Sequence, residues 1–101
     1  MANDLLISYD LYEPQKNYAR LEAAIKLLGD PTRIHKSFWY VQSDRNGVAA
    51  MQVLKAASDA SDRIVVIDTT NATFVYDHLN PEVHLPVRME WTAYTFHQFT
   101  P

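Results

Sequence analysis

Two apolar runs stand out in the hydrophobic pattern of the chain. The first covers residues 5–11 (LLISYDL) and carries Asp10 near its end, and the second is residues 64–67 (IVVI), followed by Asp68. Short continuous runs rich in Ile, Leu, Val and Tyr are typical of strands buried in a sheet. The pattern therefore predicts two buried strands, each with a carboxylate at its carboxyl end.

Two segments between these runs have the spacing of helices. After Pro14, apolar side chains recur at steps of three and four residues, and they are Tyr18, Leu21, Ile25 and Leu28. This spacing predicts an amphipathic helix with Asn17 as its N-cap and Gly29 just beyond its last turn. A second helix is predicted from Val48 to about Ala60.

The segment TRIHKSFWYVQS between the two helices is rich in β-branched and aromatic residues, which favour strand. Two alternatives fit it: one long bent strand, or a tight hairpin broken near Lys36. Alternation along a strand puts Phe38 and Tyr40 on one face. Trp39 and Val41 lie on the other face, and one of these two pairs is expected in the core.

The predicted order is strand, helix, strand or hairpin, helix, strand, all within residues 1–68. Right-handed crossovers onto one sheet make this a ferredoxin-like βαββαβ arrangement of the α+β class. Residues 69–101 hold few helix signals and many Thr, Pro and aromatic residues. We interpret them as an extension of the same single domain, with short strands at 74–76, 87–91 and 93–99. Such strands are expected to join a sheet edge of the chain or of a partner, as an edge strand or a dimer clasp.

Composition narrows the classes of protein that fit. The 101 residues suit one domain, and the absence of cysteine excludes disulfides and thiolate metal sites. No segment approaches the ~20 apolar residues of a membrane span, and the first residues lack a secretory pattern, so we expect a cytoplasmic protein without membrane contact. The lack of a Gly-rich loop argues against P-loop and dinucleotide binding. The net charge of −3 opposes nonspecific binding to nucleic acid, so any such role needs a local site.

A small cluster of acidic residues and histidines lies in the extension, and it consists of Asp77, His78, Glu82 and His84. Neutral imidazole beside carboxylates is what a Zn²⁺ or Mn²⁺ site requires, but the spacing matches no closed zinc motif. Asn80 and Pro81 indicate a loop here, where solvated histidines are ordinary. Asp68 is interpreted as a turn residue, because the first and last strands need not end on the same side of the sheet.

Four short motifs occur in the order and spacing of a known family. They are residues 6–11 (LISYDL), the helix end Leu28-Gly29, residues 33–39 (RIHKSFW) and residues 62–67 (DRIVVI). Over residues 5–68 they resemble the small CRISPR adaptation nucleases, and most closely their stand-alone SinR-like relatives. The resemblance implies a ferredoxin-like fold and a homodimer.

The resemblance also implies a site. In that family the Asp that ends the first strand faces its counterpart across a two-fold axis, and the pair is proposed to hold one divalent metal for phosphodiester hydrolysis. The matching residue is Asp10, as catalytic residue and as ligand of Mg²⁺ or Mn²⁺, with RNA or DNA as substrate. Ser37 matches the Ser of the family's S-x-F/W segment, and Ser37 and Tyr9 are candidates to support the carboxylate. Hard carboxylate oxygens supplied by two copies suit Mg²⁺.

Basic residues are the candidates for phosphate contact. Lys16 is the single Lys in the loop after Asp10, where the family nucleases commonly have several basic residues. Arg33 and Lys36, beside the aromatic residues 38–40, would make a small stacking and phosphate-binding surface. The scarcity of basic residues supports a second hypothesis, a non-catalytic dimeric module of the same fold that binds protein or nucleic acid. In that case Asp10 simply begins the turn after the strand and caps backbone N–H groups.

Overall fold

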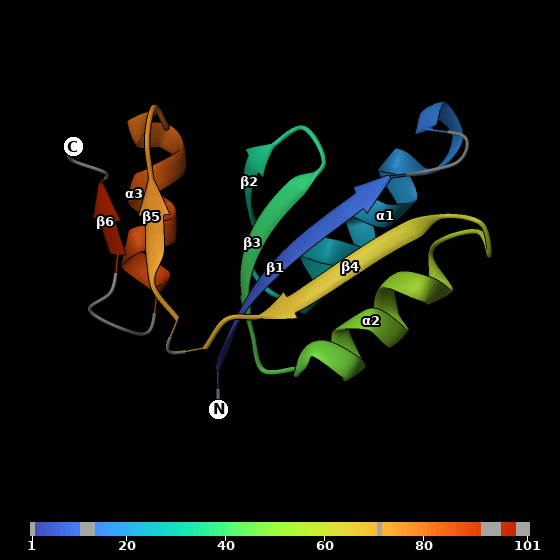
Figure 1. Cartoon of the computed structure of the whole chain (residues 1–101). Coiled ribbons are helices and arrows are strands. Elements are labelled where there is room, and N and C mark those ends of the chain that lie inside the picture. Colours follow the sequence, from blue (N-terminus) through green and yellow to red (C-terminus); the bar gives the residue numbers. More distant parts are fainter. Residues whose placement is uncertain (1, 11–13, 71, 92–95, 99–101) are drawn as a thin grey trace.

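The chain folds into a four-stranded antiparallel sheet with two helices on one face and a smaller unit against part of the other (Figure 1). The computed structural model describes residues 2–10, 14–70, 72–91 and 96–98, with only the backbone of residues 14–17. The sheet and its helices consist of β1 (Asn3–Asp10), α1 (Pro14–Leu28), β2 (Thr32–His35), β3 (Phe38–Ser43), α2 (Gly47–Ala56) and β4 (Arg63–Asp68). The predicted α+β class is confirmed.

The order of strands in this sheet is β2-β3-β1-β4. β1 lies inside the sheet and is antiparallel to both neighbours, so Ile7 is opposite Trp39 of β3 and Val66 of β4. β2 and β3 form a hairpin with its turn at Lys36 and Ser37, which confirms the hairpin alternative. β4 is an edge strand in the described structure, and this position leaves part of it open to solvent.

α1 ends where the sequence predicts, directly before Gly29, but it begins before the predicted cap. The helix begins at Pro14, so Asn17 lies inside its first turn and the predicted N-cap is wrong. Proline suits the first turn, because its missing N–H would have no partner there. Gly29 follows the helix without a positive φ. It is required for space, since a Cβ at this position would collide with the carbonyl oxygen of Gln42.

The start of α2 follows the usual chemistry of an N-cap. The side chain of Asn46 accepts a hydrogen bond of 2.9 Å from the backbone N–H of Ala49. The helix ends at Ala56, four residues before the predicted end at Ala60. Residues 57–62 then lead directly into β4.

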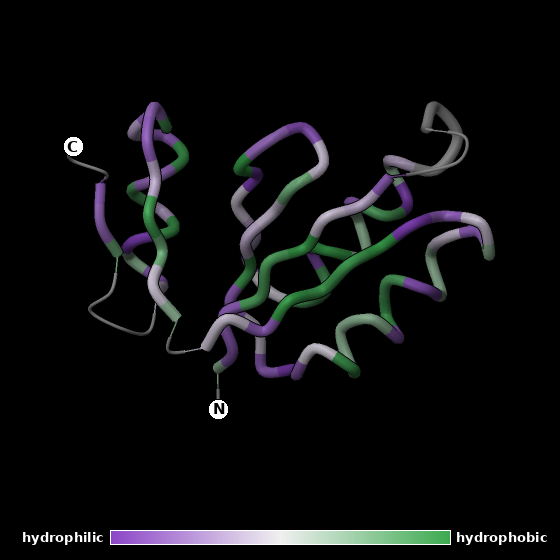
Figure 2. Tube along the Cα trace, in the orientation of Figure 1, coloured by the Kyte–Doolittle hydropathy of each residue, from purple (hydrophilic) through white to green (hydrophobic). Residues whose placement is uncertain are grey.

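The main core lies between the sheet and the two helices. Apolar side chains of one sheet face meet those of α1 and α2, and the fully buried residues of this cluster are Leu5, Ile7, Leu21, Ile25, Val41, Ala50 and Leu54. Figure 2 shows the apolar positions concentrated along β1 and β4. Trp39 belongs to this core, whereas Tyr40 is buried on the opposite face against the C-terminal unit. Trp39 and Val41 are therefore the predicted core pair, and the other face of β3 is covered as well.

The C-terminal unit consists of β5 (Phe74–Tyr76), α3 (Pro81–Glu90) and β6 (Phe96–Gln98). β5 and β6 pair with each other in a separate parallel two-stranded sheet. The unit packs on the sheet face that α1 and α2 leave free, where Val87 and Trp91 contact the region of Ile34 and Tyr40. The described part of the extension therefore covers a face of the main sheet and adds no strand to it.

The helix α3 corrects the prediction for residues 81–91. The strand predicted over 87–91 is wrong, because residues 81–90 are helical. Pro81 occupies the first turn, and Val83, Val87 and Trp91 recur every four residues, so they share the face that meets the sheet. Strand 74–76 is confirmed, and the predicted strand 93–99 is found at 96–98, its other residues lying outside the described ones.

Among the described residues, no helix combines the length and the apolar character that crossing a lipid bilayer demands.

Candidate functional site

Asp10 is the exposed last residue of β1 and lies opposite Arg63, the first residue of β4. Residues directly opposite each other in an antiparallel pair share a sheet face, and so do residues two apart along a strand. Asp10, Ser8 and Arg63 therefore lie on the face opposite α1 and α2. The C-terminal unit contacts the β2–β3 side of this face, and Ser8 and Asp10 are both exposed.

Tyr9 points the other way, into the main core. Its hydroxyl accepts a hydrogen bond of 3.0 Å from the indole N–H of Trp39, and its ring lies 5.7 Å from that of Tyr18. Burial raises the pKa of the Tyr9 hydroxyl above its ordinary value. The hydroxyl of Tyr9 and the carboxylate of Asp10 lie on opposite faces of the sheet, so Tyr9 acts on Asp10 only through the backbone.

Ser37 lies next to the end of β1, in the turn between β2 and β3. Its carbonyl oxygen accepts a hydrogen bond of 3.1 Å from the backbone N–H of Tyr9. The structure thus brings the Ser37 main chain beside the residue that precedes Asp10. This contact fixes the strand end from which the Asp10 carboxylate projects.

The Arg33 side chain makes its contacts within the chain, with Glu22 and Trp39. Its guanidinium pairs with the carboxylate of Glu22 on α1 and lies 4.7 Å from the centre of the Trp39 ring. Because Arg33 is opposite Trp39 in the β2–β3 pair, this cation is on the helix-covered face, away from Asp10. Lys36 is exposed in the turn, and the side chain of Lys16 lies outside the described residues.

The predicted aromatic stacking surface is not formed as expected. Trp39 is buried in the main core and Tyr40 is buried beneath the C-terminal unit, so neither ring is open to a nucleic acid base. Phe38 is half-buried and stacks on His35, with ring centres 6.2 Å apart. The rings occupy these places because both faces of β3 are covered.

The acidic and histidine residues do not gather into one group. Within the described residues, no three His, Asp or Glu side chains lie close enough to hold a metal ion. His78 is an exposed loop residue 3.0 Å from Asp77, as the loop prediction has it, but His84 is helical and its ring stacks on Tyr76. Asp10 fits the role of one Mg²⁺ ligand, as an exposed carboxylate on a rigid strand end, and a second copy would have to supply the other.

Asp68 behaves as the predicted turn residue. Its carboxylate accepts hydrogen bonds from the backbone N–H and the hydroxyl of Thr70, at 3.0 and 2.6 Å. It is opposite Leu5, at the far end of the β1–β4 pair from Asp10. Five residue steps of about 3.4 Å separate the two positions by roughly 17 Å, so these carboxylates cannot share an ion.

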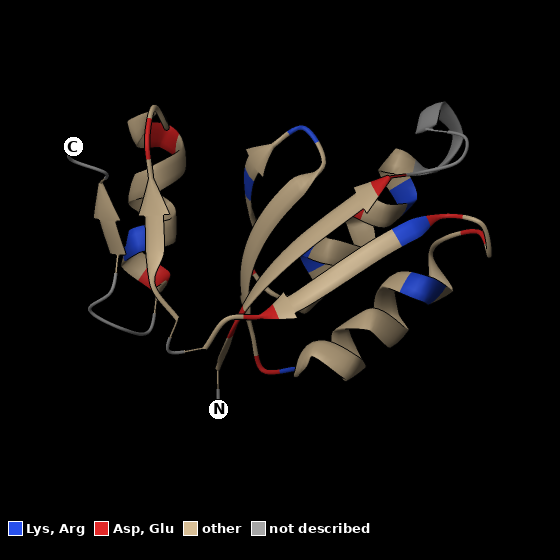
Figure 3. Ribbon diagram, in the orientation of Figure 1, with Lys and Arg blue, Asp and Glu red and all other residues tan. Residues whose placement is uncertain are grey.

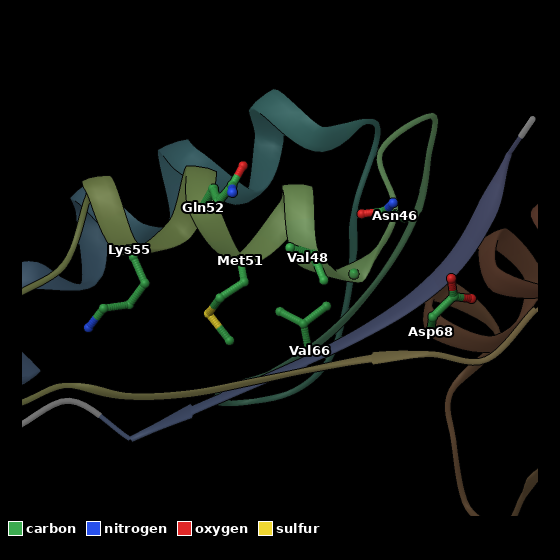
Figure 4. A pocket seen from close by; sticks show the side chains of 8 residues that line it. Asn46, Val48, Met51, Gln52, Lys55, Val66 and Asp68 are labelled. Atoms are coloured by element: carbon green, nitrogen blue, oxygen red, sulfur yellow. The ribbon is translucent and has the colours of Figure 1, made fainter.

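The exposed edge of β4 is a feature that the sequence pattern missed. The run 64–67 was predicted to be buried, yet Val65 and Ile67 are 53% and 49% exposed on the face that carries Asp10. On the helix side, an open groove of about 710 Å³ runs between α2 and β4 (Figure 4). Val48, Met51 and Val66 supply its apolar lining, and Val48 is 72% exposed. We call these five apolar residues the β4 surface.

Charges mark the two ends of this surface. Figure 3 shows that β4 begins with a basic residue and ends with an acidic one, which are Arg63 and Asp68. Lys55 and Asp68 line the groove at its opposite ends, as Figure 4 shows. Lys55 also donates a hydrogen bond of 3.3 Å to the carbonyl oxygen of Asp59, which holds it near the start of β4.

A buried carboxylate, Asp4, lies on the sheet face that also carries Tyr40. Its Oδ1 accepts a hydrogen bond of 2.6 Å from the hydroxyl of Tyr40, and its backbone carbonyl accepts one of 2.7 Å from the N–H of Thr69. Burial, followed by the hydrogen bond to Asp4, raises the pKa of Tyr40. Sequence reasoning had no signal for Asp4, because only the packing of the C-terminal unit buries it.

Comparisons of the chain with models of protein families, with curated proteins and with solved structures find no match.

Proposed function

We propose that this chain is a binding module of ferredoxin-like fold that engages an extended protein strand along β4. The observation that carries the proposal is the β4 surface, in which apolar side chains lie exposed on both sides of an unpaired strand edge. The proposal is a specific form of the second hypothesis from the sequence, a non-catalytic module that binds protein.

The sheet topology supports the ferredoxin-like part of the proposal. Residues 3–68 run through the strand and helix order βαββαβ, and the sheet order is β2-β3-β1-β4 with all neighbours antiparallel. Both helices pack on one face. These are the features expected of two crossovers of the same hand onto one sheet.

The binding mode follows from the chemistry of an edge strand. Among the described strands none pairs with the outer edge of β4, and such edges bind extended peptides by adding them to the sheet. Side chains of an added strand alternate between the two faces. On one face they would enter the groove beside Met51, and on the other they would lie against Val65 and Ile67.

A labelled peptide with the sequence of residues 62–69 tests this mode, because it has the alternating apolar character that the edge should accept. We expect saturable binding to the full chain by fluorescence anisotropy. Val65→Lys should weaken it roughly tenfold, since one buried Val contributes about 1.5 kcal/mol. Val75→Lys is the matched control, because Val75 is 56% exposed on β5. Absence of saturable binding to a chain that light scattering shows to be monomeric, or equal weakening by both variants, would overturn the proposal.

Metal-dependent phosphodiester hydrolysis is the second candidate function. The observation that favours it is the position of Asp10, exposed at a strand end on the uncovered part of the sheet, where a two-fold partner could bring a second Asp10. A divalent ion bound there would activate water and stabilise charge on the phosphate. Lys36 is an exposed cation available for phosphate contact and Lys16 remains a proposed one, whereas Arg33 is paired with Glu22 on the opposite face of the sheet.

A cleavage assay separates the two candidates. Purified protein is incubated with single-stranded RNA or with DNA and Mg²⁺ or Mn²⁺, alongside Asp10→Ala. Asp44→Ala is the control, because Asp44 is an exposed turn residue between β3 and α2. Cleavage that only Asp10→Ala abolishes would establish the nuclease. Equal cleavage by all three proteins, or none by any, would refute catalysis at Asp10.

A further inference from the structure

We propose that the strand bound along β4 is β4 of a second copy of this chain, so that two sheets join edge to edge into one antiparallel sheet of eight strands. The inference rests on the proposed binding mode and names its partner. It starts from the β4 sequence itself, which is apolar on both faces, with Ile64 and Val66 on the helix side and Val65 and Ile67 on the other.

The distribution of charge favours an antiparallel arrangement of two copies. The N-terminus of α2 lies near Asp68, because a Cβ on Gly47 would be 4.0 Å from the Cβ of Asp68. Lys55 lies eight residues further along the helix, about 12 Å towards the start of β4. A two-fold axis at the middle of β4 brings the Lys55 end of each copy to the Asp68 end of the other. A parallel arrangement would instead place like charges together.

The faces of the sheet restrict the register. A two-fold axis perpendicular to the sheet keeps both pairs of helices on one side, so a residue can only oppose a partner residue of the same face. Near the strand centre, either Val65 or Val66 must then oppose its own copy. With Val65 on the axis, Asp68 would oppose the partner's Asp62, and like charges directly opposite are unfavourable. With Val66 on the axis, Val65 opposes the partner's Ile67, so the second register is the one proposed.

This arrangement covers the exposed apolar residues on both sides of the edge. Val65 and Ile67 become cross-strand neighbours of their counterparts on one face. On the other face, Val48 and Met51 of the two α2 helices approach each other across the axis beside Val66. The arrangement also separates the two Asp10 residues by three strand spacings across the sheet, roughly 14 Å, and by six residue steps along it, roughly 20 Å, so they are too far apart to share one Mg²⁺.

Disulfide trapping tests the register directly, because the natural chain has no cysteine. Val66→Cys is expected to form a covalent dimer on mild oxidation, since the two Cα atoms across the axis lie within the range of a disulfide. Val65→Cys, displaced by one position, should give far less, and Val75→Cys on β5 controls for random collision. Crosslinking of Val65→Cys in place of Val66→Cys would overturn the register, and equal crosslinking of all three would overturn the specific interface.

Light scattering of the full chain tests dimer formation without a disulfide. We expect twice the chain mass of 11.6 kDa, falling to the monomer mass in the double variant Val65→Lys, Ile67→Lys and unchanged in Val75→Lys. Circular dichroism establishes that the variants are folded. A wild-type chain that is monomeric up to hundreds of micromolar would overturn the inference. If that monomer still binds the peptide of residues 62–69, the proposed function stands and only the identity of the partner is wrong.

Discussion

The hydroxyl of Tyr40 donates a 2.6 Å hydrogen bond to the buried carboxylate of Asp4. The two residues lie on neighbouring strands, and the ring of Tyr40 continues outward to pack 5.6 Å from the ring of Trp91. One phenol therefore satisfies a buried charge-bearing group and anchors the C-terminal unit. Through these two contacts Tyr40 links the main sheet to the C-terminal unit.

Tyr40→Phe should lower the free energy of unfolding by about 1–3 kcal/mol, because it leaves Asp4 buried without this donor while the ring stays in place. Urea unfolding followed by circular dichroism measures the change. Tyr76→Phe is the control, since the half-buried Tyr76 donates no hydrogen bond from its hydroxyl within the described residues. Equal losses in both variants would contradict the role of the Asp4 contact.

Glu90 should make stability depend on pH. Burial, then the nearby carboxylates of Asp30 and Asp4, raises the pKa of Glu90. A raised pKa means that the folded chain holds this proton more tightly than the unfolded chain, so the stabilisation is complete below the ordinary pKa of 4.5 and is lost as pH rises through the folded value.

Glu90→Gln removes this dependence, because glutamine imitates the neutral acid. We expect the variant to melt at a higher temperature than wild type at pH 7, with the difference disappearing towards pH 4. Glu82→Gln is the control in the exposed first turn of the same helix. A difference that grows as pH falls would have the wrong sign for this explanation.

The two glycines of the chain should respond in opposite directions to alanine. At Gly29 a methyl group collides with the Gln42 carbonyl, so Gly29→Ala should destabilise the fold by about 1–3 kcal/mol. At Gly47 the nearest atoms belong to Val66 and Asp68 at 3.9 and 4.0 Å, which is ordinary contact. Gly47→Ala should be neutral or stabilise by up to about 0.5–1 kcal/mol. Thermal denaturation of both variants checks the signs.

The two asparagines at helix starts provide a matched pair. Asn46 caps α2 through its side chain, whereas Asn80 precedes α3 without a side-chain cap hydrogen bond. Asn46→Ala should cost about 1 kcal/mol of unfolding free energy, and Asn80→Ala clearly less. Urea midpoints of the two variants measure the difference, and an equal effect would show that the cap contributes nothing beyond helix propensity.

Much of the fold up to residue 68 could be predicted because each element carries its own local period. Apolar residues from Tyr18 to Leu28 have the spacing of a helix, and the β-branched and aromatic residues after Thr32 favour a strand. The helix α3 was missed because Pro81, Pro86 and the β-branched valines conceal a repeat of four that becomes meaningful only against the sheet. Local pattern cannot show which face another element will cover.

The candidate site likewise contains residues that the sequence identifies and others that only the tertiary structure reveals. Asp10 was identified because a carboxylate at the end of an apolar run is visible in sequence. The exposure of Val65 and Ile67 was not predicted, since an edge strand and an interior strand can have the same composition and only the strand order separates them. The pairing of Arg33 with Glu22 depends on how α1 lies over the hairpin, which is also a tertiary property.

The central place of β1 has a consequence for how the protein is made. β1 pairs with β3 and β4, and the carbonyl oxygen of its Asp4 accepts a hydrogen bond from Thr69, so β1 cannot complete its contacts until a residue 65 positions further along has been synthesised. Contacts so distant in sequence form slowly. During translation the apolar β1 therefore stays without both of its partner strands until β4 has been made, and in that interval it is a segment that a nascent-chain chaperone would bind.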